Sequence, residues 1–403
     1  MPAVNPDILI WARETAGLSL EAAAKSLGLL DNQKKSGVDK LLELERGDVE
    51  PTQQQLMKMS EHYRRSLVIF YLDTPPPRGD RGQDFRALPN TGPTREDALL
   101  DALIRDLQMR QSIVRALLED EEAQPLPFIA SAQIEDGLQL VAQRIVSTLQ
   151  FNLATFRAAK RTDQAFAYLR TQIEKVGIFV LLVGNLGSHH SAISVETFRG
   201  FAIADLIAPF VIINSQDSKS AQSFTALHEV VHLWIGATGV SGAPGTSIGT
   251  PTEQFCNDVA GEILLPLREL DELHGIEDHE LEDAAQIIIE FAGLRHVSRS
   301  MVAYKLYRTS MISHEFWERL NAYFLKEWLR FKQGQKEKEK LDDTGGPTYY
   351  ITQGSRLGSA LLHLVNRAIN GGMLTSTKAG KVLGIKPRNV DPLLKTVLRQ
   401  RGR

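Results

Sequence analysis

Residues 224–236 read FTALHEVVHLWIG, with two histidines four positions apart and a glutamate directly after the first. On a helix, His228 and His232 lie one turn apart on the same face, so their ring nitrogens can share one zinc ion. Glu229 is rotated by about 100° from His228, which suits a base acting on water at the metal rather than a ligand. The apolar neighbours predict a buried helix, and buried histidines need partners. The spacing therefore predicts a metal centre.

A third ligand is expected in the segment 250–266, TPTEQFCNDVAGEILLP. Glu253 and Asn257 are four residues apart, so they share a helix face and Asn257 can orient the carboxylate from the next turn. Glu253 also has an alternative role, because it stands at the third position of a capping box that begins at Thr250. Glu262 is the second candidate ligand. It is rotated by about 900° from Glu253 and so lies on the opposite face, which means that one straight helix cannot present both acids to one metal.

The remaining chemistry around this centre is less specific. Cys256 is interpreted as a small buried apolar residue beside the site rather than a nucleophile. The segments 200–204 and 209–214 are strand candidates, and either could present an edge to an extended peptide. By side-chain type alone, the candidates for stabilising an oxyanion are His189, His190, His296 and Tyr304, and each of them also fits a structural or exposed role.

Three motifs occur in order along the chain: PFVIIN (209–214), FTALHEVVHLW (224–234) and EQFCNDVAGEILLP (253–266). Through these three motifs the sequence resembles the ImmA/IrrE-type metallopeptidase family. The pattern of that family is a strand with Pro and Asn, then HExxH, then E-x-x-x-N-x-x-A-x-x-x-L-L-P. The resemblance implies that Glu229 is the catalytic base and that the zinc ligands are His228, His232 and Glu253. Gly261 and Glu262 depart from the pattern, because family members more often carry alanines there.

The pattern of helix and strand candidates that would position these residues predicts an α+β, mostly helical protein. We expect a zincin-like peptidase core with a small sheet, flanked by helix-turn-helix-like modules at both ends. The strand candidates are the apolar runs 178–183, 200–204 and 209–214. Composition changes along the chain divide it into an Xre-like domain at 1–72, a Pro/Gly-rich linker at 73–94, a helical arm at 95–150, the metallopeptidase domain at 151–331, a charged linker at 332–347 and a basic module at 348–403.

The N-terminal segment resembles the Xre-like (Cro/repressor) helix-turn-helix domain. Residues 7–28 predict two helices, with a break at Gly17, a cap at Ser19 and an end at Gly28. The apolar anchor expected at position 34 is a lysine, and the nearest fit is Leu41, which implies an insertion of about seven residues. Nine basic and ten acidic residues in 1–72 leave no basic stripe. We therefore expect this domain to bind either DNA or a protein partner.

The C-terminal segment has a different charge. Residues 353–403 contain ten Lys or Arg and one acid, a net of +9, whereas the whole chain is at −3 and the remainder is at −12. A tight helix-turn-helix is indicated by the spacing of Gly380, Gly384 and Val390, with Ser376 or Thr377 as a cap. The second helix would begin with the base-reading residues Lys386, Arg388 and Asn389. The alternative is a basic tail that packs on the acidic body.

Composition limits the class of protein. The chain has 403 residues, 43% hydrophobic and 24% charged, which excludes a disordered or uniformly basic protein. A single cysteine permits no internal disulfide, and the apolar run 176–184 is too short to span a bilayer. We therefore expect a cytoplasmic protein with no membrane segment.

Taken together, these features predict a zinc-dependent endopeptidase fused to DNA-binding-type modules. Its expected partners are a repressor or antitoxin as protein substrate, DNA, and a second copy in a homodimer. One alternative is a DNA-binding transcriptional regulator, or the antitoxin of a toxin–antitoxin pair, in which the peptidase fold mainly binds the partner. A further alternative is a metal sensor in which zinc controls DNA binding.

Overall fold

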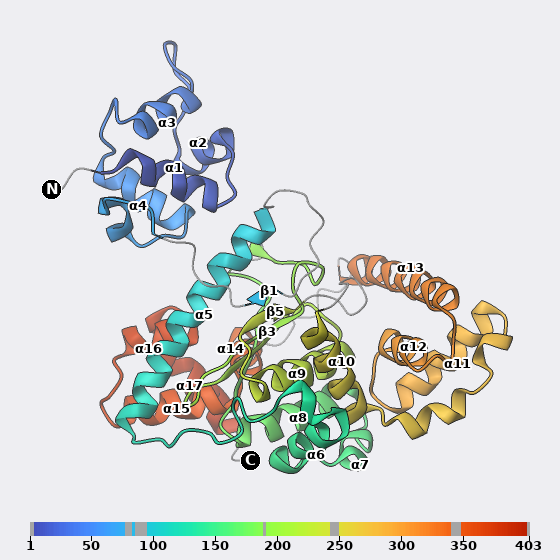
Figure 1. Ribbon diagram of the computed structural model, residues 1–403. Coiled ribbons are helices and arrows are strands. Elements are labelled where there is room, and N and C mark those ends of the chain that lie inside the picture. Colours follow the sequence, from blue (N-terminus) through green and yellow to red (C-terminus); the bar gives the residue numbers. More distant parts are fainter. Residues whose placement is uncertain are drawn as a thin grey trace.

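The computed structural model describes residues 4–76, 83–84, 95–187, 191–241, 250–339 and 348–400. The chain is mostly helical with one small mixed sheet, which confirms the expected α+β class (Figure 1). No helix within these residues is both long enough and apolar enough to cross a membrane.

The N-terminal helices build a core of their own from residues that include Ile8, Leu41 and Phe70, each fully buried. Gly17 and Gly28 follow the first two helices in the left-handed region, as expected. Residues 28–36 separate the second and third helices, and the expected insertion of about seven residues would fall within this connection. The elements are α1 (Pro6–Thr15), α2 (Leu20–Leu27), α3 (Gly37–Arg46), α4 (Gln53–His62) and the 3₁₀ turn η1 (Leu67–Tyr71).

The sheet has the order β1-β5-β3-β4-β2. Strands β1 and β5 pair in parallel, as do β2 and β4, whereas β3 is antiparallel to both β4 and β5. Three of the strands confirm the predicted apolar runs. The strand bounds are β1 (Gln83–Asp84), β2 (Phe179–Leu182), β3 (Gly200–Ile203), β4 (Phe210–Ile213) and β5 (Gly239–Ser241).

Successive side chains of a strand point to opposite faces, and here both faces are buried. Val180, Leu182, Ala202, Val211 and Ile213 join one apolar core. The alternate side chains of the same strands join a second core on the other face: Phe179, Leu181, Phe201, Ile203, Phe210 and Ile212. Burial on both faces explains why these strands read as continuous apolar runs rather than as alternating ones.

The first core is formed with the helices of the predicted peptidase segment 151–331 and with α6, which precedes it. They are α6 (Leu138–Leu149), α7 (Leu153–Arg157), α8 (Thr162–Lys175), α9 (Lys219–Trp234), α10 (Pro251–Leu264), α11 (Leu281–Leu294), α12 (Arg299–Arg308) and α13 (His314–Glu339). Short 3₁₀ turns connect them: η2 (Ile134–Asp136), η4 (Leu267–Leu273) and η5 (Ile276–Asp278). Because α13 runs through Glu339, the first half of the expected linker 332–347 is helical, and 340–347 lie outside the described residues.

The second core holds α5 together with the C-terminal helices (Figure 1). Its elements are α5 (Arg95–Asp120), α14 (Tyr349–Leu357), α15 (Ser359–Asn370), α16 (Ser376–Leu383), the 3₁₀ turn η6 (Pro387–Asn389) and α17 (Val390–Gln400). This differs from the expected arm at 95–150 and separate module at 348–403. The apolar face of α5 packs on the sheet and on α16, whereas α6 belongs to the first core. Most of the expected linker 73–94 lies outside the described residues, but two of its residues form β1.

A buried ion pair joins the C-terminal helices to α8. Arg170 Nε donates to Glu174 Oε1 at 2.9 Å, and both side chains are nearly inaccessible to solvent. Arg170 also donates to the backbone oxygens of Val180 and Arg356. The other oxygen of Glu174 accepts from the backbone N–H of Ser359 at 3.0 Å, at the start of α15. A carboxylate at a helix N-terminus satisfies N–H groups that have no partner within the helix.

Candidate metal centre

Helix α9 places the two predicted histidines on its buried face. Its N-cap is Ser218, whose hydroxyl accepts from the backbone N–H of Ala221 at 3.3 Å. Every side chain from Ala221 to Trp234 is buried, as the apolar sequence predicted. The Nε2 atoms of His228 and His232 lie 3.1 Å apart. Two imidazole nitrogens therefore meet at one point inside an apolar core.

Helix α10 supplies the third group. The hydroxyl of Thr250 accepts from the backbone N–H of Glu253 at 3.3 Å, so Thr250 caps the helix as proposed. The carboxylate of Glu253 lies with the histidines instead: Oε1 is 2.8 Å from His232 Nε2, and Oε2 is 3.3 Å from His228 Nε2. Only the Thr250 half of the expected capping box is present, because the Glu253 side chain contacts the histidines rather than the backbone of Thr250.

The three side chains fit a small divalent cation. One nitrogen from each of His228 and His232 and one oxygen from Glu253 all lie within 4.8 Å of one another. Ligand atoms about 2.0–2.1 Å from a tetrahedral zinc are about 3.3 Å apart, close to the separations found here. Two imidazoles and a carboxylate are also a ligand set that zinc accepts in hydrolytic enzymes. This buried group could therefore hold a metal.

The electrostatics keep the carboxylate in the form that binds a metal. Burial alone would raise the pKa of Glu253, but the neighbouring His228 and His232 hold it at about 2. Burial lowers the pKa of His232. Burial also acts to lower the pKa of His228, but the adjacent Glu253 carboxylate raises it overall. Glu253 is consequently an anion facing two imidazoles.

Glu229 follows His228 on α9 and is completely buried. A Cβ atom on Gly200, at the start of β3, would stand 2.7 Å from Glu229 Oε1 and 2.6 Å from Thr225 Cγ2. Only a glycine lets the strand approach the carboxylate this closely. The sequence reasoning did not identify Gly200, although a glycine inside an apolar strand candidate was a signal for a close approach.

Two residues one turn further along α10 contact the histidines. The side chain of Asn257 hydrogen-bonds His228, whereas we expected it to orient Glu253. The sulfur of Cys256 lies 3.7 Å from His232 Nδ1, the ring nitrogen that faces away from the other ligands. Burial raises the pKa of Cys256, which keeps it a thiol. Cys256 is buried beside the site, as expected, and it also contacts a candidate ligand.

The second candidate ligand, Glu262, lies away from the centre. Its carboxylate contacts Lys305 Nζ at 2.7 Å and accepts from the backbone N–H of Leu267 at 3.1 Å. The helical rotation argument thus separates Glu253 from Glu262 correctly.

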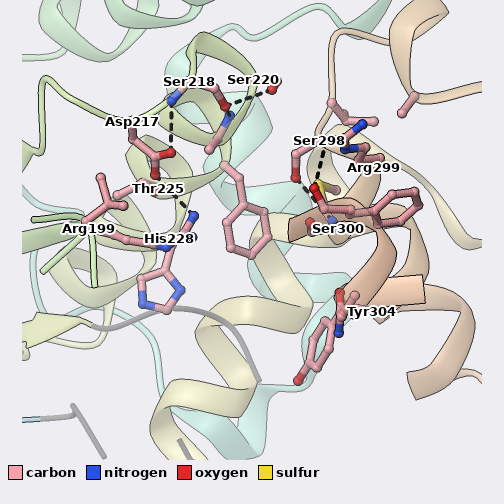
Figure 2. A pocket seen from close by; sticks show the side chains of 18 of the residues that line it. Arg199, Asp217, Ser218, Ser220, Thr225, His228, Ser298, Arg299, Ser300 and Tyr304 are labelled. Atoms are coloured by element: carbon pink, nitrogen blue, oxygen red, sulfur yellow. Dashed lines mark hydrogen bonds and ion pairs between the residues drawn. The ribbon is translucent and has the colours of Figure 1, made fainter. Parts of the chain in front are cut away.

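The centre lies at one wall of a cavity of about 650 Å³, which is lined by His228 and Glu229. Figure 2 shows Ser218 and His228 on one side of this cavity and Ser298 and Tyr304 on the other. The walls come from the start of α9, from α11 and α12, and from α13. The ion pair of Arg199 with Asp217, at 3.1 Å, also lines it.

The oxyanion candidates differ in their contacts. His296 lines the cavity, but its ring is held by the backbone oxygen of Ala159 at 2.8 Å and by Thr162 Oγ1 at 3.2 Å, which indicates a structural role. Tyr304 lines the same cavity, and burial raises the pKa of its hydroxyl. His189 and His190 lie outside the described residues.

Neither strand that we expected to present an edge is free to do so. β3 pairs with β4 and β5, and β4 pairs with β2 and β3, so both are internal. The expectation for 200–204 and 209–214 is therefore wrong. The sequence could not predict that β5 pairs with β3, because β5 is only three residues long.

The residues expected to read DNA lie in the turn η6 and next to it. Lys386 and Arg388 are exposed and Asn389 is half-buried. The cap of α16 is Thr375 rather than Ser376 or Thr377, and Gly384 ends the helix in the left-handed conformation. Helix α17 buries one face against α14. DNA contact by Lys386, Arg388 and Asn389 remains a prediction.

Comparison with known proteins supports the peptidase assignment for the middle of the chain. No curated protein and no solved structure gives a match. The model of a peptidase family, described as the IrrE N-terminal-like domain, matches residues 176–307, about a third of the chain. The matched segment contains the histidines of α9 and the acidic residue of α10, and it does not include residues 1–72. The segment that carries the candidate metal centre is thus similar to the IrrE N-terminal-like peptidase domain.

Proposed function

We propose that this protein is a zinc-dependent endopeptidase that cleaves a protein involved in gene regulation. The observation that supports it most is the meeting of His228, His232 and Glu253 at the wall of a cavity that also receives Glu229. The similarity of this segment to a peptidase family also supports it.

The roles of the side chains follow from their positions. His228, His232 and Glu253 would hold the ion, which supplies a Lewis acid that polarises a carbonyl group. Glu229 is the proton acceptor in this proposal, because its buried carboxylate lines the same cavity as His228. Gly200 fixes the position of that carboxylate from the strand side. A repressor or antitoxin is the proposed substrate, and the exposed basic turn at Lys386 and Arg388 is the proposed DNA contact.

The test compares metal content with cleavage. Purified protein should contain about one zinc per chain, and His232→Ala should lose it. Glu229→Gln should keep the metal and lose cleavage, while Glu282→Gln, a matched change of an exposed carboxylate on α11, should keep both. Co-purification with the Glu229→Gln protein would then capture the uncleaved substrate.

Two outcomes would contradict the proposal. If the wild-type protein binds no divalent metal, the proposed metal-dependent cleavage is wrong. If Glu229→Gln retains the full biological effect in cells, the peptidase fold acts as a partner-binding scaffold and the alternative function is correct.

A further inference from the structure

A second cavity, of about 220 Å³, adjoins the one that contains the metal centre. Four residues line both cavities: Phe224, Asn257, Met301 and Tyr304. Asn257 also hydrogen-bonds His228. The second cavity therefore opens within one side chain of a candidate metal ligand.

The lining of this cavity carries no unbalanced charge. Its apolar walls include Phe224, Met301 and the side chain of Leu138. Its four charged residues form two ion pairs, Asp258 with Arg308 at 3.1 Å and Glu262 with Lys305 at 2.7 Å. A charged occupant would lose its hydration without gaining a partner, whereas an apolar one gains by burial.

Helix α10 presents a glycine to this cavity. Gly261 is buried and lines the cavity, and a Cβ built on it would meet no atom within 4 Å. A glycine inside a helix costs about 0.5–1 kcal/mol relative to alanine, so the space is kept at the expense of stability. An engineered cavity of about 150 Å³ admits benzene. The space beside Gly261 is thus large enough for an aromatic or branched side chain.

We propose that this cavity is a specificity pocket that accepts a bulky, uncharged side chain of the substrate close to the cleaved bond. The proposal rests on the proposed peptidase function. It adds a substrate class, namely segments with an aromatic or large aliphatic residue at one fixed position, and it assigns Gly261 as the residue that sets the size limit.

The test fills the pocket without weakening the helix. Gly261→Leu occupies the space, and Gly261→Ala adds a single methyl group as a graded control. Both should melt no lower than wild type, because each replaces a helix-interior glycine. A peptide library incubated with the protein and read by mass spectrometry should show Phe, Tyr, Leu or Met at one position of the sites cut by wild type.

The variants should shift that preference. Gly261→Leu should lower kcat/KM for the bulky peptide by about ten-fold or more, a typical effect of pocket volume. It should change kcat/KM little for the same peptide with Ala at that position, and Gly261→Ala should fall between. If Gly261→Leu keeps the wild-type preference, the pocket assignment is overturned while the peptidase function stands.

A binding measurement separates the two proposals when no peptide is cut. In ligand-observed NMR, N-acetyl-phenylalaninamide should bind wild type more strongly than N-acetyl-alaninamide does, and Gly261→Leu should abolish the difference. Absence of cleavage with this binding pattern would overturn the peptidase function alone. Equal binding of the phenylalanine amide to wild type and Gly261→Leu would overturn the pocket.

Discussion

Two buried clusters of charged groups lie at different places around the sheet, and they are built differently. In the cluster of α9 and α10, the ligand atoms of His228, His232 and Glu253 point at one another. In the cluster at the junction of α8 with α14 and α15, Arg170 and Glu174 point at each other and at backbone groups of opposite polarity.

The difference distinguishes a group that could bind a ligand from one that is satisfied within the fold. At the junction, each charged group meets donors or acceptors supplied by the chain itself, so the cluster is complete as folded. At the candidate metal centre, three groups that can each donate an electron pair share one small space, an arrangement that suits a cation. The candidate metal centre is therefore distinguished by the convergence of three potential ligand atoms. Burial and charge are common to both clusters.

The largest effect on this difference is expected from removing one side chain of the candidate metal centre. Glu253→Ala should lose the bound zinc and reduce cleavage below detection, since two histidines alone are an incomplete ligand set. Metal analysis after dialysis and a peptide cleavage assay measure this. Addition of a chelator to wild type should reproduce the loss, and zinc should restore activity to wild type only. Retention of one zinc by Glu253→Ala would show that Glu253 is not a ligand.

Removing one member of the junction should affect stability and leave the metal in place. Glu174→Ala leaves Arg170 buried without its carboxylate partner, which should lower the free energy of unfolding by about 3–5 kcal/mol. Chemical denaturation measures this, with metal content recorded in parallel. The matched control is Asp391→Ala, which removes an exposed pair with Lys395 at the same helical spacing and should cost under about 0.5 kcal/mol. Equal effects of the two variants would contradict the distinction between the clusters.

A smaller change tests whether the position of the Glu229 carboxylate matters for cleavage. Gly200→Ala should displace the Glu229 carboxylate and lower kcat by about 100-fold while zinc stays bound. Gly371→Ala is the control, since its added Cβ would make contacts no shorter than 3.4 Å. Unchanged kcat in Gly200→Ala would mean that Glu229 tolerates displacement and is not the base.

The smallest expected effect concerns the thiol behind His232. Cys256→Ala removes the sulfur next to Nδ1 and should weaken zinc binding by about ten-fold, the low end for a residue that orients a ligand, because sulfur is a weak acceptor. Competition with a zinc chelator gives the affinity. Cys256→Ser should recover part of the zinc affinity. Identical affinities for wild type and both variants would show that Cys256 only packs against His232.

The two clusters also differ in how far sequence could reveal them. His228, Glu229 and His232 share one helix with diagnostic spacing, so local periodicity was sufficient for them. For Glu253 on the next helix, periodicity left Glu262 as a second candidate, and the family resemblance favoured Glu253. The strands of the core were likewise predictable as apolar runs. Arg170 and Glu174 read as an ordinary i, i+4 pair on a helix surface, because their burial depends on residues almost two hundred positions later.

The same reason explains the remaining errors. The packing of α5 with the C-terminal helices and the pairing of β5 with β3 are contacts between distant segments, which helical or strand periodicity does not encode. The proximity of Gly200 to Glu229 has the same origin. Prediction succeeded where a single element carried the signal, or where the family resemblance linked α9 with α10, and failed where other distant elements had to meet.

The shared core of the sheet and the C-terminal helices has a consequence for protein synthesis. The N-terminal helices have a core of their own and could fold while the rest of the chain is still being made. One face of the sheet needs Leu357, Leu361 and Val390 for its cover, and these residues emerge from the ribosome on the order of ten seconds after β4. Ribosomes that stop before α17 would release a sheet with exposed apolar surface. Such chains should be substrates for chaperones and proteases, so that the candidate metal centre should form stably only in chains translated through α17.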